Sequence, residues 1–230
     1  MNDMVLNSAT IGVVISLLAY EIGLILKKKT KIAIFNPLLI SIILVILFLL
    51  VFGVDYTCYN SSAKYLSYLL TPATVCLAIP LYQQMEQLKK NFGAIILGIF
   101  SGVLTSLVTI LLMSMLFGLS HEEYVTLLPK SITTAIGMGV SEELGGYVTI
   151  TVAVIIITGI LGNMIGESVC KWFCIKSPVA RGLALGTSSH AIGTARAMEL
   201  GEVEGAMSSL AIVVSGLCTV VAASVFAMLY

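Results

Sequence analysis

The sequence predicts an all-α polytopic membrane protein whose internal repeats contain discontinuous or re-entrant helices, as in secondary transporters. Of its 230 residues, 58% are hydrophobic and only 10% are charged, whereas a soluble domain carries about 25% charged residues. The mean hydropathy is +1.06. The third observation is a set of polar segments, interrupted by Pro or Gly, within this apolar chain. Because so few charges cannot cover a water-facing surface, we expect one transmembrane domain over residues 1–230 in a lipid bilayer.

Five apolar segments approach or exceed the length of about 20 residues that a helix needs to cross a bilayer. They are residues 11–26, 32–52, 92–117, 148–173 and 206–229. The first two form an N-terminal part, residues 1–60.

Clusters of lysine give an orientation. The stretch KKKTK (27–31) follows the first span, and Lys89 and Lys90 follow two further crossings. Since basic loops stay in the cytoplasm, we expect both clusters inside and the N-terminus outside the cell. The first ten residues carry Asp3 and no Lys or Arg, so we expect no cleaved signal peptide.

Three weaker segments are interrupted by helix breakers: residues 63–82, 122–146 and 178–201. If 122–146 crossed the membrane, the basic residues Lys171, Lys176 and Arg181 would lie outside. If it enters and returns, they lie inside, and we favour this re-entrant reading. A full crossing stays open.

The sequence also shows internal similarity at an offset of 57 residues. LLTPATVCLAIPL (69–81) resembles TLLPKSITTAIGM (126–138), and SGVL (101–104) resembles TGIL (158–161). A weaker third copy places HAIG (190–193) over TAIG (134–137), one residue out of phase. We therefore expect repeats at 61–118 and 119–176, then a broken polar helix with the last span at 177–230. The expected hinges are Pro72, Pro80, Pro129, Gly137 and Gly193.

Such breaks have a physical meaning in a membrane. A broken helix leaves N–H and C=O groups unpaired, and each costs several kcal/mol in hydrocarbon. Breaks persist where they are buried in protein or line a wet cavity, as in transporters whose broken helices bind substrate near the midplane. The alternative is a packing kink relieved by neighbouring helices.

The stretch RGLALGTSSHAIGTARA (181–197) gathers the scarce polar residues. On a helix, Gly182 and Gly186 lie on a stripe of small residues where another helix can pack. Hydroxyl residues flank His190, a titratable group that is costly in lipid and could carry a proton.

The candidate residues for binding an anionic substrate come from all three interrupted segments. They are Thr74, Ser131, Thr133, Thr134, Thr187, Ser188, Ser189, His190, Thr194 and Arg196. Simpler roles stay open: helix capping for the hydroxyls, a buried structural histidine, an Arg196–Glu199 ion pair, and a snorkelling side chain for Lys130.

Several function classes are excluded. No basic field for nucleic acid, no phosphate loop and no Ser-His-Asp pattern occurs, so we expect no enzyme. The two histidines and five cysteines are scattered, so we expect neither a metal site nor another cofactor.

The stretch 181–197, with ELGEVEGAMSSLAI (199–212), LTPATVCLAIPLY (70–82), LPKSITTAIGMGVS (128–141) and FNPLLISIIL (35–44), strongly resembles the LrgB/CidB family of bacterial membrane proteins. GMGVSEELGG lacks a proline that many members carry after TAI. The resemblance implies a multi-pass protein of the bacterial cytoplasmic membrane, described as antiholin-like or as a modulator of murein hydrolase activity and autolysis. It also implies a small LrgA/CidA-type holin-like partner.

Two functions follow as hypotheses. The first is a secondary transporter of small monocarboxylates, because a plastid relative in this family resembles a glycolate/glycerate translocator and bacterial members are linked to pyruvate. The second is a regulator of lysis that binds the holin-like partner through Gly182 and Gly186. A homo-oligomer is compatible with either.

Overall fold

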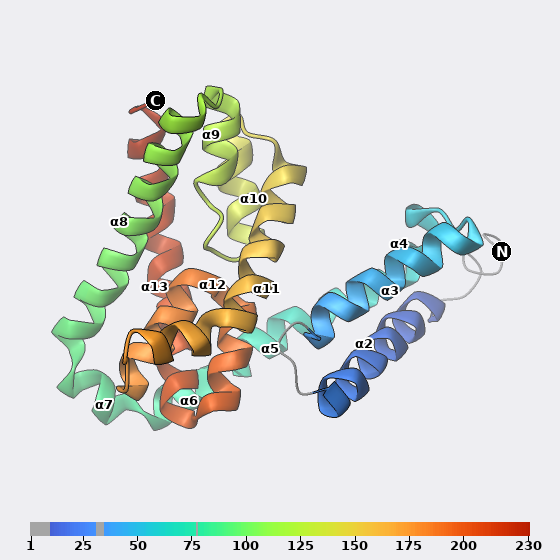
Figure 1. Cartoon of the computed structure of the whole chain (residues 1–230), viewed down its shortest axis with the longest axis horizontal. Coiled ribbons are helices and arrows are strands. Elements are labelled where there is room, and N and C mark those ends of the chain that lie inside the picture. Colours follow the sequence, from blue (N-terminus) through green and yellow to red (C-terminus); the bar gives the residue numbers. More distant parts are fainter. Residues whose placement is uncertain (1–9, 31–34, 77) are drawn as a thin grey trace. The chain divides into compact units, whose positions relative to one another are not determined.

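The computed structural model describes residues 10–30, 35–76 and 78–230 (Figure 1). The predictions made for Asp3, for the signal peptide and for Lys31 lie outside these residues. Within them the regular structure is entirely helical. The chain divides into two compact units, residues 1–76 and 77–230.

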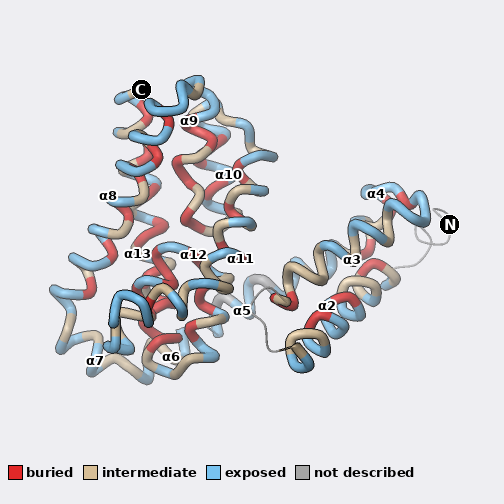
Figure 2. The backbone as a smooth tube through the Cα atoms, viewed as in Figure 1, coloured by how far each residue is buried: buried red, intermediate tan, exposed pale blue. Residues whose placement is uncertain are grey.

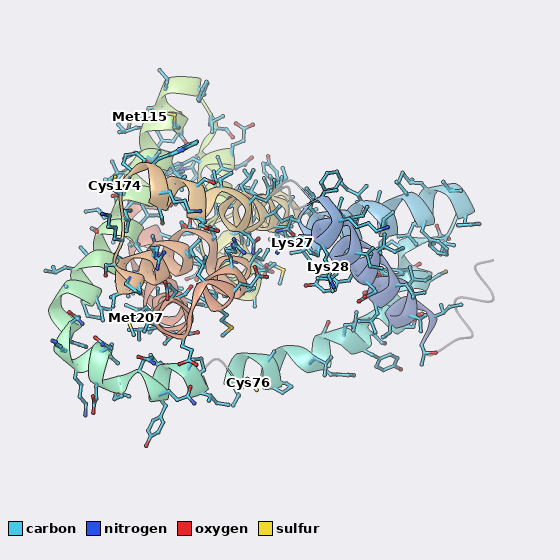
Figure 3. The ribbon with its side chains drawn as sticks, turned by 60° about the horizontal axis from the view of Figure 1, so that its bottom comes forward. Lys27, Lys28, Cys76, Met115, Cys174 and Met207 are labelled. Carbon is cyan, nitrogen blue, oxygen red and sulfur yellow. The ribbon has the colours of Figure 1, made fainter. Side chains whose placement is uncertain are left out.

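The first unit contains α2 (Ile11–Thr30), α3 (Pro37–Phe52), α4 (Tyr56–Ala63), the 3₁₀ helix η1 (Lys64–Leu69) and α5 (Leu70–Cys76). Basic side chains end α2, where the negative end of the helix dipole favours them, and Figure 3 labels two of them, Lys27 and Lys28. Asn36 caps α3 by accepting a hydrogen bond from the amide of Leu38 at 2.9 Å. Gly23 of α2 lies against the backbone of Pro37, so the two helices approach closely.

The second unit contains α6 (Ala78–Gln83), α7 (Met85–Lys90), α8 (Phe92–Phe117), α9 (His121–Leu127), α10 (Thr134–Glu143), α11 (Val148–Trp172), α12 (Pro178–Leu200) and α13 (Glu202–Ala227). Buried residues line the inner faces of α12 and α13, and exposed residues cover the outer face of α8 (Figure 2).

Length and apolar composition identify the helices that can cross a membrane. Among the described residues these are α8, α11, α13 and the run of short helices over Tyr56–Gln83, with α3 as a shorter apolar helix. The prediction of an all-α polytopic membrane protein is therefore confirmed.

The segment between α8 and α11 folds back on itself and forms hairpin 1, residues 120–146. It starts at Ser120, which forms a capping box with Glu123. At its other end the Tyr147 hydroxyl donates to Glu122 Oε2 at 2.7 Å, and the Tyr147 amide donates to Thr126 Oγ1 at 2.8 Å. That hydrogen bond to a carboxylate raises the pKa of the Tyr147 hydroxyl. Both ends of hairpin 1 thus lie together, which is the re-entrant geometry.

The helix α12 also folds back, and we call residues 177–201 hairpin 2. His190 has φ 43° and ψ −136°, which interrupts the helix. Before this break, Gly182 lies against Glu204 and Gly186 against Ser208, so the first arm runs parallel to α13. After the break, Thr194 Oγ1 is 2.7 Å from Ser208 Oγ and Met198 lies against Gly205. These contacts run in reverse order, so the second arm is antiparallel to α13.

The two hairpins enter from opposite ends of α11 and meet near its middle. Hairpin 1 joins the N-terminal end of α11, and hairpin 2 follows its C-terminal end. Ile155 contacts both of them. Its side chain faces Gly137 of hairpin 1, and its carbonyl accepts a hydrogen bond from His190 Nε2 of hairpin 2 at 3.0 Å.

In the structure the similar segments fall on a full helix followed by a hairpin. The echo SGVL/TGIL falls on α8 and α11, and TAIG and HAIG lie where the return arm of each hairpin begins. The predicted boundaries instead started each repeat at an interrupted segment. In the first expected copy, residues 69–81, the chain forms the short helices α5 and α6, which belong to different units.

Two of the expected hinges are wrong. Gly137 lies inside α10, where it makes room for Ile155, and the turn of hairpin 1 comes earlier, around Pro129. The break in α12 lies at His190, three residues before Gly193. Gly193 instead lets the return arm approach the Leu185 carbonyl. Pro72 and Pro80 are each the third residue of a short helix, where a missing N–H costs little.

Candidate functional site

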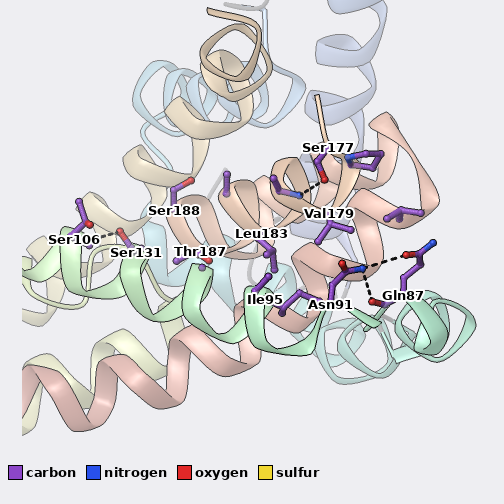
Figure 4. A pocket seen from close by; sticks show the side chains of 18 of the residues that line it. Gln87, Asn91, Ile95, Ser106, Ser131, Ser177, Val179, Leu183, Thr187 and Ser188 are labelled. Atoms are coloured by element: carbon purple, nitrogen blue, oxygen red, sulfur yellow. Dashed lines mark hydrogen bonds between the residues drawn. The ribbon is translucent and has the colours of Figure 1, made fainter. Parts of the chain in front are cut away.

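A cavity of about 950 Å³ lies between α8, the tip of hairpin 1 and the first arm of hairpin 2 (Figure 4). It follows α8 from Asn91 to Thr109, which is about five helical turns. Its volume is in the range of small-molecule sites. Eleven of its 21 lining residues carry polar or charged side chains, so the positions of these groups decide what the cavity can bind.

Small residues on α8 bring α12 close along this wall. Gly98 and Gly102 both line the cavity. A Cβ added at Gly102 would lie 2.7 Å from the methyl group of Thr187, so a larger residue would push α12 away. One and two turns beyond Gly102, the hydroxyls of Thr105, Ser106 and Thr109 join the lining.

The tip of hairpin 1 supplies the cation at this part of the cavity. Lys130 Nζ donates to Ser131 Oγ at 3.0 Å, and Ser131 Oγ is 3.3 Å from Ser106 Oγ of α8. Figure 4 shows Ser106 and Ser131 side by side. In the described part of the chain no carboxylate lies within ion-pair distance of Lys130.

Hairpin 2 adds two hydroxyls to the lining. Thr187 is 9% exposed, and its buried Oγ1 has no hydrogen-bond partner among the described residues. Ser188 Oγ is 3.0 Å from Ser189 Oγ. The cavity thus unites three of the predicted binding residues, Ser131, Thr187 and Ser188.

Other predicted binding residues of hairpin 2 lie outside the cavity. Ser189 faces Gly162 of α11. His190, 3% exposed, forms the turn and donates Nε2–H to the Ile155 carbonyl, so it is a structural residue of the hairpin tip. Thr194 donates to the His190 carbonyl at 3.0 Å and contacts Ser208. Contacts between helices therefore keep these three side chains out of the cavity lining.

The guanidinium of Arg196 is not free to bind the carboxylate of a substrate, so the prediction that Arg196 is a binding residue is corrected. It pairs with Glu199 at 2.5 Å and with Glu167 of α11. Glu167 also pairs with Lys171 at 2.7 Å. This ion-pair network ties the return arm of hairpin 2 to the end of α11.

The remaining predicted residues lie near the ends of short helices. Thr133 is the N-cap residue of α10, without a side-chain capping bond, and Thr134 is its first residue. Neither lines the cavity. The side chain of Thr74 lies outside the described residues.

Gly182 and Gly186 are covered by α13. A Cβ added at Gly182 would meet the backbone of Glu204, and one at Gly186 would meet the backbone of Ser208. Their small size serves helix packing inside the chain, the role given to their stripe of small residues, and leaves them covered rather than open to a partner.

The helix α8 contributes lining hydroxyls that its apolar composition does not predict. Thr105, Ser106 and Thr109 lie within an otherwise apolar span. Their spacing of three to four residues, continuing from Gly98 and Gly102, is the signal that places them on one helical face. No group of three metal-ligating residues occurs in the part of the chain searched, residues 10–30, 35–76 and 78–230.

Comparison with known proteins gives one family. Residues 16–229 match the family model described as the LrgB-like family. Antiholin-like protein LrgB of Bacillus mycoides (strain KBAB4) is 40% identical over 216 residues, covering 94% of both chains. Proteins of that name from Bacillus cereus (strain B4264) and Bacillus anthracis (strain CDC 684 / NRRL 3495) match equally. No solved structure matches significantly. Since the match spans nearly the whole sequence, this chain belongs to the LrgB-like family of multi-pass membrane proteins.

Proposed function

We propose that this chain is an antiholin-like protein of the bacterial cytoplasmic membrane, which restrains lysis together with a small holin-like membrane partner. The observation that carries this proposal is the 40% identity, over 94% of the chain, to proteins named antiholin-like LrgB. The partner would contact the outer apolar faces of the helices, since Gly182 and Gly186 are covered by α13. This role involves no catalysis.

A lysis assay tests this role. The chain is expressed in a bacterium that lacks its own family member, with and without a holin-like partner, and detergent-induced autolysis is followed by optical density. We expect slower lysis than with the empty vector. The packing variant Gly186→Val, which disrupts α12 against α13, serves as the inactive control. An unchanged lysis rate at equal membrane levels of wild type would contradict the proposal.

The cavity favours a second function, a carrier of small monocarboxylates such as pyruvate, lactate or glycolate. In many transporters, interrupted helices at the interface of inverted repeats form the substrate site, and the two hairpins that meet at Ile155 support a site of this kind. The cavity beside these tips holds Lys130 and several hydroxyls. Export or import of a metabolite and control of lysis are compatible in one protein.

Uptake into liposomes tests the carrier. We expect purified protein to accumulate labelled pyruvate, lactate or glycolate, and Ala184→Trp to reduce uptake to near background by filling the cavity that Ala184 lines. Ala153→Trp, on an exposed position of α11, is the matched control and should transport normally. Folded wild-type protein that transports none of the three acids would refute this function.

A further inference from the structure

We propose that Lys130, Ser131 and Ser106 form a binding site for one monovalent anion, with the Thr187 hydroxyl as a further donor. This inference deepens the proposed carrier function by naming its anion subsite, and it rests on that function for the ligand being a carboxylate. The site lies where the tip of hairpin 1 meets α8 and the first arm of hairpin 2 (Figure 4).

The first argument is that the other half-buried cations of this unit are paired with carboxylates. Arg181 faces the buried carboxylate of Glu204 at 2.5 Å, and Arg196 pairs with two glutamates. Lys130 lines the cavity and is half-buried, and among the described residues its ammonium group hydrogen-bonds only to the hydroxyl of Ser131. A partly desolvated cation is costly without a counter-charge, and an anion in the cavity would supply one.

The second argument is the set of neutral hydroxyl donors that line the same cavity as Lys130. A serine or threonine hydroxyl can donate one hydrogen bond and rotates to suit its partner. Ser106 and Ser131 lie 3.3 Å apart, so at most one of them donates to the other and the second hydroxyl hydrogen stays available. Thr187 Oγ1 is buried and unpartnered within the described structure. Ammonium and hydroxyl donors together suit the oxygens of a carboxylate.

The third argument is charge balance, which selects a monoanion. The cavity lining contains two cations, Lys130 beside the hairpin tips and Lys90 near the start of α8, where it is exposed. A monoanion bound at Lys130 neutralises the charge of this lysine. A dianion would bring a second negative charge without a cation beside it, which is unfavourable away from water.

Equilibrium binding to the purified full-length protein in detergent tests the site. Labelled lactate is the ligand, and unlabelled pyruvate, nitrate and succinate are the competitors. We expect pyruvate to compete and succinate to compete at least about tenfold more weakly. Competition by nitrate equal to that by pyruvate would show a general monoanion site and overturn the preference for a carboxylate.

Variants assign the binding to Lys130. Lys130→Gln should weaken lactate binding at least about tenfold, because it removes a charge-assisted hydrogen bond. Lys89→Gln removes the same charge from an exposed position outside the cavity lining and should leave binding unchanged. Lys130→Arg keeps the charge and should retain most of the binding. A thermal unfolding curve like that of wild type shows that each variant is folded.

The results separate the site from the carrier function. Unchanged lactate binding in Lys130→Gln would overturn the site, even if the wild type transports lactate. Binding that depends on Lys130, without uptake by wild-type liposomes, would support the site and refute the carrier. Succinate competing as well as pyruvate would overturn the monoanion selection.

Discussion

Arg181→Met is expected to lower the free energy of unfolding by about 3–5 kcal/mol, because it leaves a buried charge without its partner. The Arg181 guanidinium lies 2.5 Å from Glu204 Oε1, and the Glu204 side chain is only 5% exposed. Their pair joins the start of hairpin 2 to the first turn of α13. Once Arg181 is lost, the buried Glu204 carboxylate has no counter-charge, and letting water reach it loosens this packing.

Thermal unfolding in detergent measures the effect, with labelling of the buried Cys170 thiol as the signal in a background in which the other four cysteines, Cys58, Cys76, Cys174 and Cys218, are replaced by Ser. Adding Glu204→Gln to Arg181→Met should restore much of the loss. Lys171→Met, whose side chain is 73% exposed in its pair with Glu167, should cost about 0–1 kcal/mol. A double variant as unstable as Arg181→Met alone would contradict the ion-pair explanation.

Gly186→Val is expected to lower the free energy of unfolding by at least about 2 kcal/mol, since overpacking a tight contact typically costs 1–3 kcal/mol. A Cβ at Gly186 would reach the Ser208 carbonyl and come within 2.8 Å of the Ala211 Cβ. Neither neighbour is the flexible end of a side chain, so α12 and α13 must separate.

The matched control is Gly139→Val in α10, where an added Cβ meets nothing within 4 Å. Both changes place a β-branched residue inside a helix, so the helix propensities cancel in the comparison. We expect the melting temperature of Gly186→Val to lie about 5 °C or more below that of Gly139→Val. Equal melting temperatures would refute the close packing of hairpin 2 on α13.

Some features of this fold can be predicted from the sequence alone. Apolar length alone predicted α8 to the residue, Phe92–Phe117, and α11 to within one residue. Basic residues after residue 146 favoured a re-entrant reading of residues 122–146, and the hydrogen bonds of Tyr147 to α9 agree with it. Each of these predictions depends on composition or on residues close together in the sequence, so it needs no knowledge of the tertiary structure.

The candidate site was predicted only in part. Pro129 and the small and hydroxyl residues around it marked the tip of hairpin 1, because backbone breaks in lipid need polar neighbours. The same reasoning predicted that His190 and Arg196 bind the anionic substrate. The structure engages them with the Ile155 carbonyl and with Glu167 instead, 35 and 29 residues away along the chain.

The sequence by itself determined the membrane class, the long helices, the interrupted segments and the family, because each depends on composition, on spacing along one helix or on a contiguous motif. Only the tertiary structure decided which polar groups face the cavity. Whether a hydroxyl or a cation forms a hydrogen bond or an ion pair within the protein depends on helices that are distant in sequence. Here α11 supplies the partners of Arg196 and His190, and Glu204 of α13 pairs with Arg181, while Lys130, Ser106 and Thr187 lie around the cavity.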